Sequence, residues 1–267
     1  MDYNILRLYA VLALIIYVII IVILERMYPY KEQKLLRKWF WDDFIFYTIF
    51  QGIVMGFIIA ELIMFIDNHA QLSRLQLVSD WPLGAQLLFF LVTHDLFIYG
   101  FHWLMHHNRF LWRFHEAHHS VRDVDWVAGS RSHPFEILIN QTVEFAPIVI
   151  LGAAPEVALL KGLIDGAWGV WIHANINVYT GWLQYVINGP EMHRWHHASG
   201  YGRINLATKL AIWDWIFGTA YRPKDKKIEQ YGLCYSGYPG GYFRQFVAFF
   251  RKEVPIDRLL RKTDVVN

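Results

Sequence analysis

Histidine is the residue type with the clearest potential for chemistry in this sequence. Eight of the 13 histidines lie in three short groups, which are HWLMH (His102 and His106), HEAHH (His115, His118 and His119) and HRWHH (His193, His196 and His197). Residues three and four positions apart share one face of a helix, so each group would present two or three imidazoles in the same direction. This spacing is typical of a chelating site for metal ions.

The number of these histidines indicates two metal ions. A first-row metal ion takes about four to six ligands, so eight or more converging imidazoles exceed one coordination sphere. Imidazole binds zinc, copper, iron and nickel alike. Structural zinc usually has cysteine ligands, however, and this chain has a single cysteine, Cys234. We therefore favour redox-active iron.

A pair of irons could activate dioxygen and remove hydrogen from an unactivated C–H bond, which side chains alone cannot do. Lipid chains and sterols offer such bonds. His102 and His106 lie at the end of an apolar stretch, so a hydrophobic substrate could enter sideways from a bilayer. We expect hydroxylation of a lipid. Desaturation, in which a second hydrogen leaves the neighbouring carbon, is the other outcome.

The other histidines have more ordinary interpretations. His173, in WIHANIN at the end of an apolar stretch, is favoured as a ninth ligand, although a single histidine there is often a plain polar helix end. His94 lies two helical turns before His102 and suits a hydrogen-bonded role better than ligation. The histidines interpreted as non-ligands are His69, His107 and His133.

Several polar residues could orient the imidazoles through hydrogen bonds from behind. The candidates are Asp95, Tyr99, Glu116 and Glu136. Asn175 or Asn177 could complete a coordination sphere through a side-chain oxygen or a bound water, but asparagine also commonly ends a helix at a membrane boundary. Plain surface or core roles stay open for all of these residues.

Long apolar segments must position these side chains. The chain is 55% hydrophobic and only 18% charged, which is unusual for a soluble protein. Residues 8–24, 44–66 and 83–105 are each long enough to cross a bilayer, which takes roughly 20 helical residues. A fourth region, 135–171, could form a hairpin of two helices that folds back at 152–155.

The distribution of basic residues predicts the topology. Arg26, Lys31, Lys34, Arg37 and Lys38 lie between the first two spans, whereas the next loop offers only Arg74. By the positive-inside rule the first loop is cytoplasmic and the N-terminus lies on the opposite side. The predicted fold is an all-α, integral-membrane bundle with about five membrane-embedded helices and a cytoplasmic histidine-rich cap.

Other classes of protein receive little support. No internal repeat or linker divides the chain, so residues 1–267 are expected to form one domain. The first span lacks a preceding basic cluster and a cleavage site, and is expected to be retained. A net charge of +2 without a basic stripe argues against nucleic acid as a partner. The sequence makes no prediction of oligomeric state.

In these motifs the sequence resembles the fatty acid hydroxylase superfamily, which includes sterol desaturases, sterol C4-methyl oxidases and alkylglycerol monooxygenases. The resemblance covers about residues 25–221. The matching motifs are HDLFIYGFHWLMH (94–106), FHEAHHS (114–120), HAN (173–175), PEMHRWHH (190–197) and WDWIFGT (213–219). Members often carry a basic residue where this chain has Trp103, so the subfamily stays open.

The resemblance implies a membrane enzyme with a di-iron centre and dioxygen as co-substrate. The ligands it implies are His102, His106, His115, His118, His119, His173, His193, His196 and His197. The supporting residues it implies near the site are Asp95, Tyr99, Asn175 and Asp214. Electrons would come from a separate donor protein, either cytochrome b5-like or ferredoxin-like. The lipid substrate would come from the bilayer.

The main alternative is a membrane protein that binds metal without catalysis, or one that carries electrons on bis-histidine haem. Haem binding would need histidine pairs at matching depth on different spans, whereas these histidines gather at the ends of spans. A transporter would need ionisable residues along a path through the membrane. A zinc hydrolase, with about three protein ligands, would leave most of these histidines unexplained.

Overall fold

The computed structural model describes residues 2–251. In this part of the chain the regular elements are helices, and β-pairing is limited to isolated bridges between Pro29 and Ile176 and between Ala198 and Tyr231. The α-helices are α1 (Tyr3–Met27), α2 (Gln51–Ala70), α3 (Leu83–His107), α4 (Arg109–His119), α5 (Pro134–Ile150), α6 (Pro155–His173), α7 (Pro190–His196), α8 (Ile212–Ile216) and α9 (Tyr242–Ala248). The predicted all-α class is confirmed for these residues.

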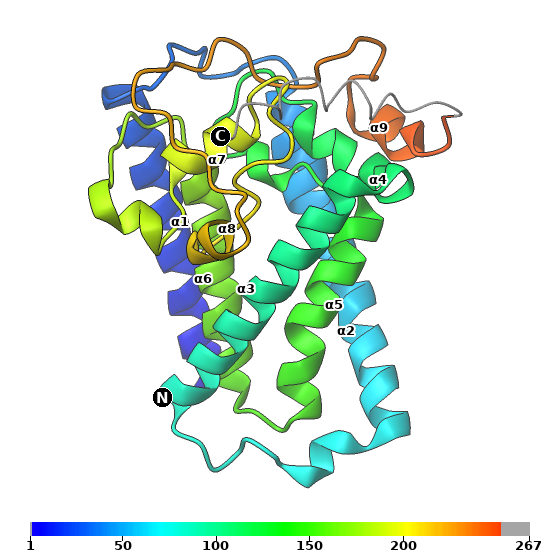
Figure 1. Cartoon of the computed structure of the whole chain (residues 1–267). Helices are drawn as coiled ribbons and strands as arrows, with labels where there is room; N and C mark the ends of the chain where they lie inside the picture. The colour runs from blue at the N-terminus through cyan, green and yellow to red at the C-terminus, as the bar shows by residue number, and fades with distance from the viewer. Residues whose placement is uncertain (1, 252–267) are drawn as a thin grey trace.

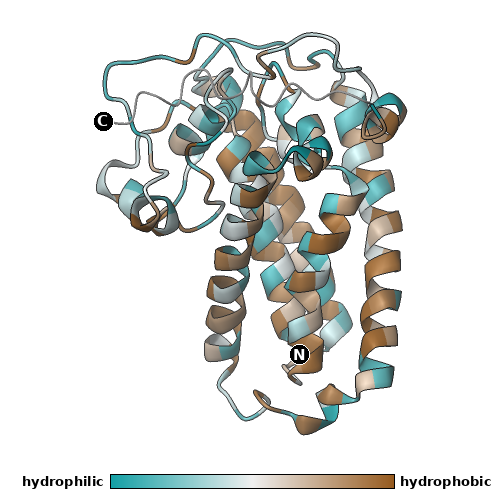
Figure 2. Ribbon diagram, turned by 45° about the vertical axis from the view of Figure 1, so that its right-hand side comes forward, coloured by the Kyte–Doolittle hydropathy of each residue, from teal (hydrophilic) through white to brown (hydrophobic). Residues whose placement is uncertain are grey.

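Three helical stretches are long and apolar enough to cross a membrane, and they contain the three predicted spans. They are α1, the stretch Asp42–Ala70 and α3. The second stretch begins with a π-helical segment, Asp42–Phe50, that continues directly into α2. Only 17%, 22% and 28% of their most apolar windows are buried inside the protein. Such exposed apolar surface needs a nonpolar surrounding, and Figure 2 shows it as brown on the long helices.

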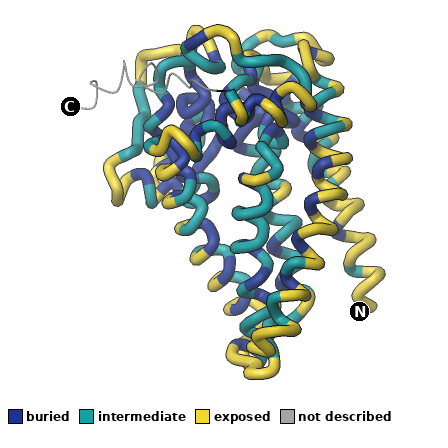
Figure 3. The backbone as a smooth tube through the Cα atoms, turned by 90° about the vertical axis from the view of Figure 1, so that its right-hand side faces the viewer, coloured by how far each residue is buried: buried dark blue, intermediate teal, exposed yellow. Residues whose placement is uncertain are grey.

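The long helices pack side by side and place the loops at two ends (Figure 1). α1 packs against α6, α2 packs against α5, and α3 contacts α4, α5 and α6. The N-terminus, the loop between α2 and α3, and the turn between α5 and α6 lie at one end, while α4 and α7 lie at the other. Buried residues gather at the end that carries α4 and α7 (Figure 3).

A short turn at residues 151–154 joins α5 to α6. Gly152 has a φ of +71°, which favours glycine, and a Cβ at this position would lie 2.9 Å from the Cα of Gln76. Pro155 is the first residue of α6, where its missing N–H has no partner to lose. The turn coincides with the fold-back predicted at 152–155, and the placement of both helices in a membrane stays a prediction.

The corner between α3 and α4 brings two histidine groups together. Asn108 separates the helices in an extended conformation, and its side-chain oxygen accepts hydrogen bonds from the N–H groups of Phe110 and Leu111. This cap satisfies N–H groups at the start of α4 that would otherwise lack partners. The chain therefore turns directly after His106, and the last turns of α4 lie beside the end of α3.

A buried ion network ties the loops around the histidines to the start of the second span. Arg37 donates to both carboxylate oxygens of Asp125 at 2.9 and 2.8 Å, and its guanidinium also lies 2.7 Å from Asp43. Arg131 donates to the other oxygen of Asp43 at 2.6 Å. Since these charges are buried together, each one needs its partners. The cytoplasmic location of this end stays a prediction.

Candidate metal centre

Five of the predicted ligands form a first cluster where α3, α4 and α7 meet. One ring nitrogen from each of these residues lies within 4.8 Å of the others, and all five side chains are buried. The members of the first cluster are His102 and His106 from α3, His115 and His119 from α4, and His196 from α7. The first cluster therefore joins three helices that are well separated in the sequence.

Hydrogen bonds leave lone pairs of the first cluster facing one another. Nδ1 of His102 donates to the Leu206 carbonyl at 2.7 Å, and Nδ1 of His115 donates to the Glu136 carboxylate at 3.1 Å. In a neutral imidazole the other nitrogen, Nε2, then carries a lone pair and no hydrogen. The two Nε2 atoms lie 2.9 Å apart, and Nε2 of His106 lies 3.2 Å from that of His102. Facing lone pairs repel, so this arrangement fits a shared cation.

The other four predicted ligands form a second cluster beside the first. One ring nitrogen from each again lies within 4.8 Å of the others, and all four side chains are buried. The members of the second cluster are His118 from α4, His173 from the end of α6, His193 from α7, and His197 directly after α7. His173, the ligand predicted from outside the three groups, thus belongs to a cluster.

The second cluster repeats the lone-pair arrangement. Nδ1 of His173 donates to the Gly169 carbonyl at 2.7 Å, and Nδ1 of His118 donates to the Arg131 carbonyl at 3.0 Å. Their Nε2 atoms, which carry lone pairs, lie 3.3 Å apart, and Nε2 of His193 lies 3.0 Å from that of His173. The donor set therefore fits two separate metal ions, one for each cluster.

Burial keeps the imidazoles in the form that binds metal. Burial is the main cause that lowers the pKa of His118, His119, His193 and His197 well below the ordinary histidine value, and neighbouring imidazoles lower it further. Burial also lowers the pKa of His196 to about 3. A metal ion binds the neutral ring, so these nitrogens do not need to lose a proton at neutral pH.

The loop at residues 204–210 orients two clustered imidazoles through its backbone. The Leu206 carbonyl accepts from His102, and the Ile204 carbonyl accepts from Nδ1 of His196 at 2.9 Å. Asp214 holds this loop because its carboxylate accepts from the N–H groups of Leu206 and Ala207 at 2.7 and 3.1 Å. Asp214 thus acts on the imidazoles through the loop.

Asp95 and Tyr99 support the same loop from α3. Asp95 accepts hydrogen bonds from the backbone N–H groups of Lys209 and Leu210 at 3.0 and 2.9 Å. The hydroxyl of Tyr99 lies 2.9 Å from that of Thr219, which donates to Asp214 at 2.6 Å. Three of the four predicted supporting residues therefore meet on one loop, which was not evident from their separate positions in the sequence.

Asn175 and Glu116 have partners away from the imidazoles. The side chain of Asn175 accepts from the N–H of Lys31 at 3.1 Å and donates to the Lys31 carbonyl at 2.7 Å, which fastens the segment after α1. Glu116 accepts from Arg251 at 2.6 Å and from the hydroxyl of Tyr235. Among the candidate orienting carboxylates, Glu136 is the one that contacts a clustered imidazole, His115.

The histidines interpreted as non-ligands lie outside both clusters. His107 and His69 are bonded to the carbonyls four residues earlier in their own helices, at 2.7 Å in each case. His133 caps the start of α5. His94 belongs to a third group with Glu144 and Asp165, whose geometry could hold a cation. The ammonium of Lys161 already lies there, 2.8 Å from His94 and 2.6 Å from Asp165.

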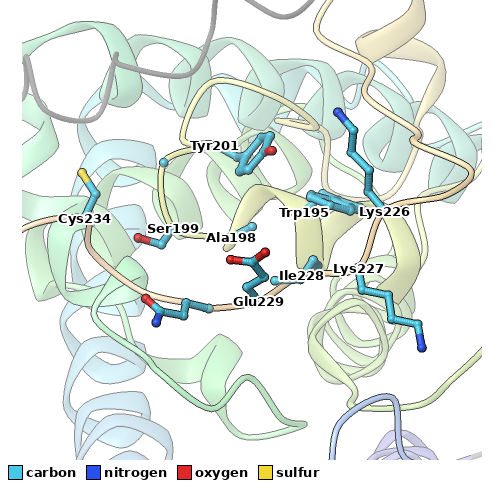
Figure 4. Close-up of a pocket in the computed structure, with 11 residues that line it drawn as sticks. Trp195, Ala198, Ser199, Tyr201, Lys226, Lys227, Ile228, Glu229 and Cys234 are labelled. Atoms are coloured by element: carbon cyan, nitrogen blue, oxygen red, sulfur yellow. The ribbon is translucent and has the colours of Figure 1, made fainter.

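Two cavities lie near this centre. A cavity of about 710 Å³ is lined by Trp195 of α7 and by the segment 226–230 (Figure 4). None of the nine clustered histidines is among the described residues that line it. A smaller cavity of about 200 Å³ is lined by histidines of both clusters together with residues of α3, α5 and α6. Of these two cavities, the smaller one is therefore the one that borders both histidine clusters.

The fold and the site together define a class: a helical protein with apolar spans whose buried histidine clusters fit metal ions. Residues 87–219 match the family model described as fatty acid hydroxylase. The chain belongs to the fatty acid hydroxylase superfamily, a family of lipid-oxidising membrane oxidoreductases. This confirms the resemblance found in the sequence motifs.

Characterised relatives oxidise lipids. The chain is 32% identical to ornithine lipid hydroxylase OlsE of Rhizobium tropici, over 66% of this chain and 55% of that protein. It is 29% identical to alkylglycerol monooxygenase of Homo sapiens, over 64% of this chain and 37% of that protein. It is 27% identical to methylsterol monooxygenase 1 of Rattus norvegicus, over 76% of this chain and 72% of that protein. The chain thus spans about half or less of the first two relatives, and no solved structure matches it.

Proposed function

We propose that this protein is a membrane-bound di-iron oxygenase that hydroxylates a lipid, with dioxygen as co-substrate. The observation that carries the proposal is the pair of clusters in which lone pairs of neutral imidazoles face one another at 2.9 to 3.3 Å. The five ligands of the first cluster and the four of the second would each hold one iron. Bound iron would supply the redox chemistry that lets dioxygen react with a C–H bond.

The reaction consumes electrons that an external donor would supply at each turnover. A lipid C–H bond, dioxygen, two electrons and two protons give a lipid C–OH group and water, so one oxygen atom enters the lipid and the other leaves as water. We propose a separate cytochrome b5-like or ferredoxin-like protein as the electron donor. Hydroxylation is preferred to desaturation because it needs one hydrogen to be removed from one carbon only.

The residues of the chain would hold the ions in place and keep water away. Hydrogen bonds from behind fix the ring orientations of His102, His115, His118 and His173, and such bonds also raise the basicity of a ligand. The buried setting of the clusters strengthens electrostatic interactions within the site. The names of the relatives support a bilayer lipid as the substrate, since those proteins are named for ornithine lipids, alkylglycerols and methylsterols.

We further propose that the clusters lie on the cytoplasmic side and that α5 and α6 form a hairpin within the membrane. The support is the excess of basic residues between the first two spans and the position of the N-terminus at the opposite end of the bundle. A cytoplasmic electron donor could then reach the end of the bundle that carries the clusters.

The test is the incorporation of labelled oxygen into lipid. Cells that produce the protein are grown under 18O2, and their lipids are compared by mass spectrometry with those of cells that produce His118→Ala or His107→Ala. We expect a lipid with one added 18O atom for the wild type and for His107→Ala, since His107 lies outside the clusters. We expect none for His118→Ala. A labelled product that persists in His118→Ala would rule out the proposed centre.

A further inference from the structure

The cavity of about 200 Å³ is small for a lipid substrate. Sites for whole small molecules usually occupy about 300–1,000 Å³. One wall consists of clustered imidazoles, including His102, His118 and His173. The space is therefore suited to one end of a lipid, and the part that enters it lies beside the metal ligands.

Charged side chains also line the cavity. They belong to Glu144, Asp165 and Lys209. The ammonium of Lys209 lies 3.1 Å from Asp165, and the buried ammonium of Lys161 lies 3.0 Å from Glu144 and 2.6 Å from Asp165. A hydrocarbon chain in the cavity would displace water from these ions without replacing its hydrogen bonds, which is unfavourable.

Two hydrogen-bond donors in the cavity wall lack partners. The ammonium of Lys161 can only donate, so Nδ1 of His94, 2.8 Å away, accepts and Nε2 carries the hydrogen. Nε2 of His94 is buried without a partner, and the side chain of His94 is only 4% exposed. Nε1 of Trp168 is also buried without a partner. Both residues line the cavity, so a ligand with anionic oxygens would satisfy them.

Two acceptors on residues that line the cavity also lack partners. They are Oε2 of Glu136 and Oδ1 of Asn140, which lie one helical turn apart on α5 and line the cavity. An ammonium group carries three donors and no acceptor, which matches a carboxylate and an amide oxygen. The unpaired groups thus match a ligand that has both an anionic and a cationic part.

We infer that the cavity binds a zwitterionic lipid headgroup, with its anionic oxygens toward His94, Trp168 and Lys209 and its ammonium toward Glu136 and Asn140. The inference rests on the proposed function for the metal centre. It adds that the oxidised carbon belongs to the headgroup, because that part of the lipid lies beside the imidazoles while the acyl chains stay in the bilayer.

The test compares lipids that share identical acyl chains and differ only in the headgroup. Binding to the full chain in detergent is measured for a lipid with an amino-acid headgroup, for phosphatidylethanolamine and for diacylglycerol. Two variants accompany the wild type: Trp168→Phe, which removes one unpaired donor, and Trp171→Phe, a matched control that packs beside α1. Iron content and oxygen-dependent product are measured on the same samples.

We expect one or both zwitterionic lipids to bind about tenfold more tightly than diacylglycerol, and Trp168→Phe to reduce this preference severalfold with unchanged iron content. Trp171→Phe should keep the preference. Tighter binding of the lipid with the amino-acid headgroup would identify a carboxylate as the anionic group. Tighter binding of phosphatidylethanolamine would identify a phosphate. Equal binding of diacylglycerol, or equal effects of the two tryptophan variants, would overturn the inference. If the purified protein holds no iron but still prefers zwitterionic headgroups, the proposed function is refuted and the inference about the headgroup is not.

Discussion

His119 and His197 end the same sequence pattern, HxxHH, yet they belong to different clusters. In α4 the pair His115 and His119 belongs to the first cluster, and His118 belongs to the second. In α7 the division is reversed, because His196 belongs to the first cluster. Residues four apart share a helix face, whereas the neighbour between them points about 100° away. Each of these two patterns therefore contributes to both clusters.

Substitutions at these positions should affect one ion at a time. We predict that His119→Ala and His197→Ala each lower the iron content from two ions per chain to about one, because each removes a ligand from a different cluster. The measurement is iron per chain by elemental analysis of purified protein, with His107→Ala, at a half-buried position outside both clusters, as the control. Two retained ions in both variants would argue against these ligand sets.

The stability of the metal-free protein should depend on pH. The pKa of His196 is about 3 in the folded protein, against about 6.5 in an unfolded chain, so the unfolded state binds the proton more tightly. This contribution to stability is present above about pH 6.5 and is lost as the pH falls toward 3. We predict that the midpoint temperature of thermal unfolding, measured in detergent, falls as the pH is lowered from 8 to 5. A midpoint temperature that stays constant or rises over this decrease in pH would contradict the claim that the clustered imidazoles are buried and neutral.

The sequence predicted the nine clustered histidines and Glu136, which accepts from His115, but not the backbone carbonyls that orient other rings. The spacing of the histidines is visible because it repeats on the scale of a helical turn. The carbonyls of Arg131, Ile204 and Leu206 carry no sequence signal, since every residue has one. The partition into two clusters also depends on how α4 and α7 lie against each other, which is a tertiary property.

At the scale of the elements, apolar length predicted the three long helices, because continuous apolar runs of that size have few other uses. The charged group around Lys161 was not predicted. Glu144 and Lys161 lie in a region of the sequence that is otherwise mostly apolar. Their ion pair joins α5 to α6. The i, i+4 spacing of Lys161 and Asp165 was the available signal.

The ion network around Arg37 should be essential to the packing of the loops. We predict that Arg37→Met lowers the free energy of unfolding by about 3–5 kcal/mol, because Asp125 and part of the Asp43 carboxylate would stay buried without their partner. The control is Lys38→Met, since Lys38 is exposed. The measurement is unfolding by denaturant titration in detergent, and equal effects of the two variants would refute the prediction.

At the scale of the whole molecule, the bundle has one end with the N-terminus and the short helical turn at 72–75 and another with α4 and α7, which carry clustered histidines (Figure 1). The single cysteine makes labelling simple, because a Cys234→Ser background leaves no native thiol. We predict that a membrane-impermeant maleimide added outside intact cells labels Ser73→Cys but not Lys226→Cys. Labelling of Lys226→Cys from outside the cell would contradict the proposed topology.

The central claim is that each histidine cluster holds one iron. The most direct measurement is Mössbauer spectroscopy on protein purified from cells grown with 57Fe. The account predicts two irons per chain in unequal environments, since the first cluster has five imidazoles and the second has four. It also predicts that His118→Ala loses the signal of the second site. A folded protein that contains zinc alone, or haem iron, would contradict the account.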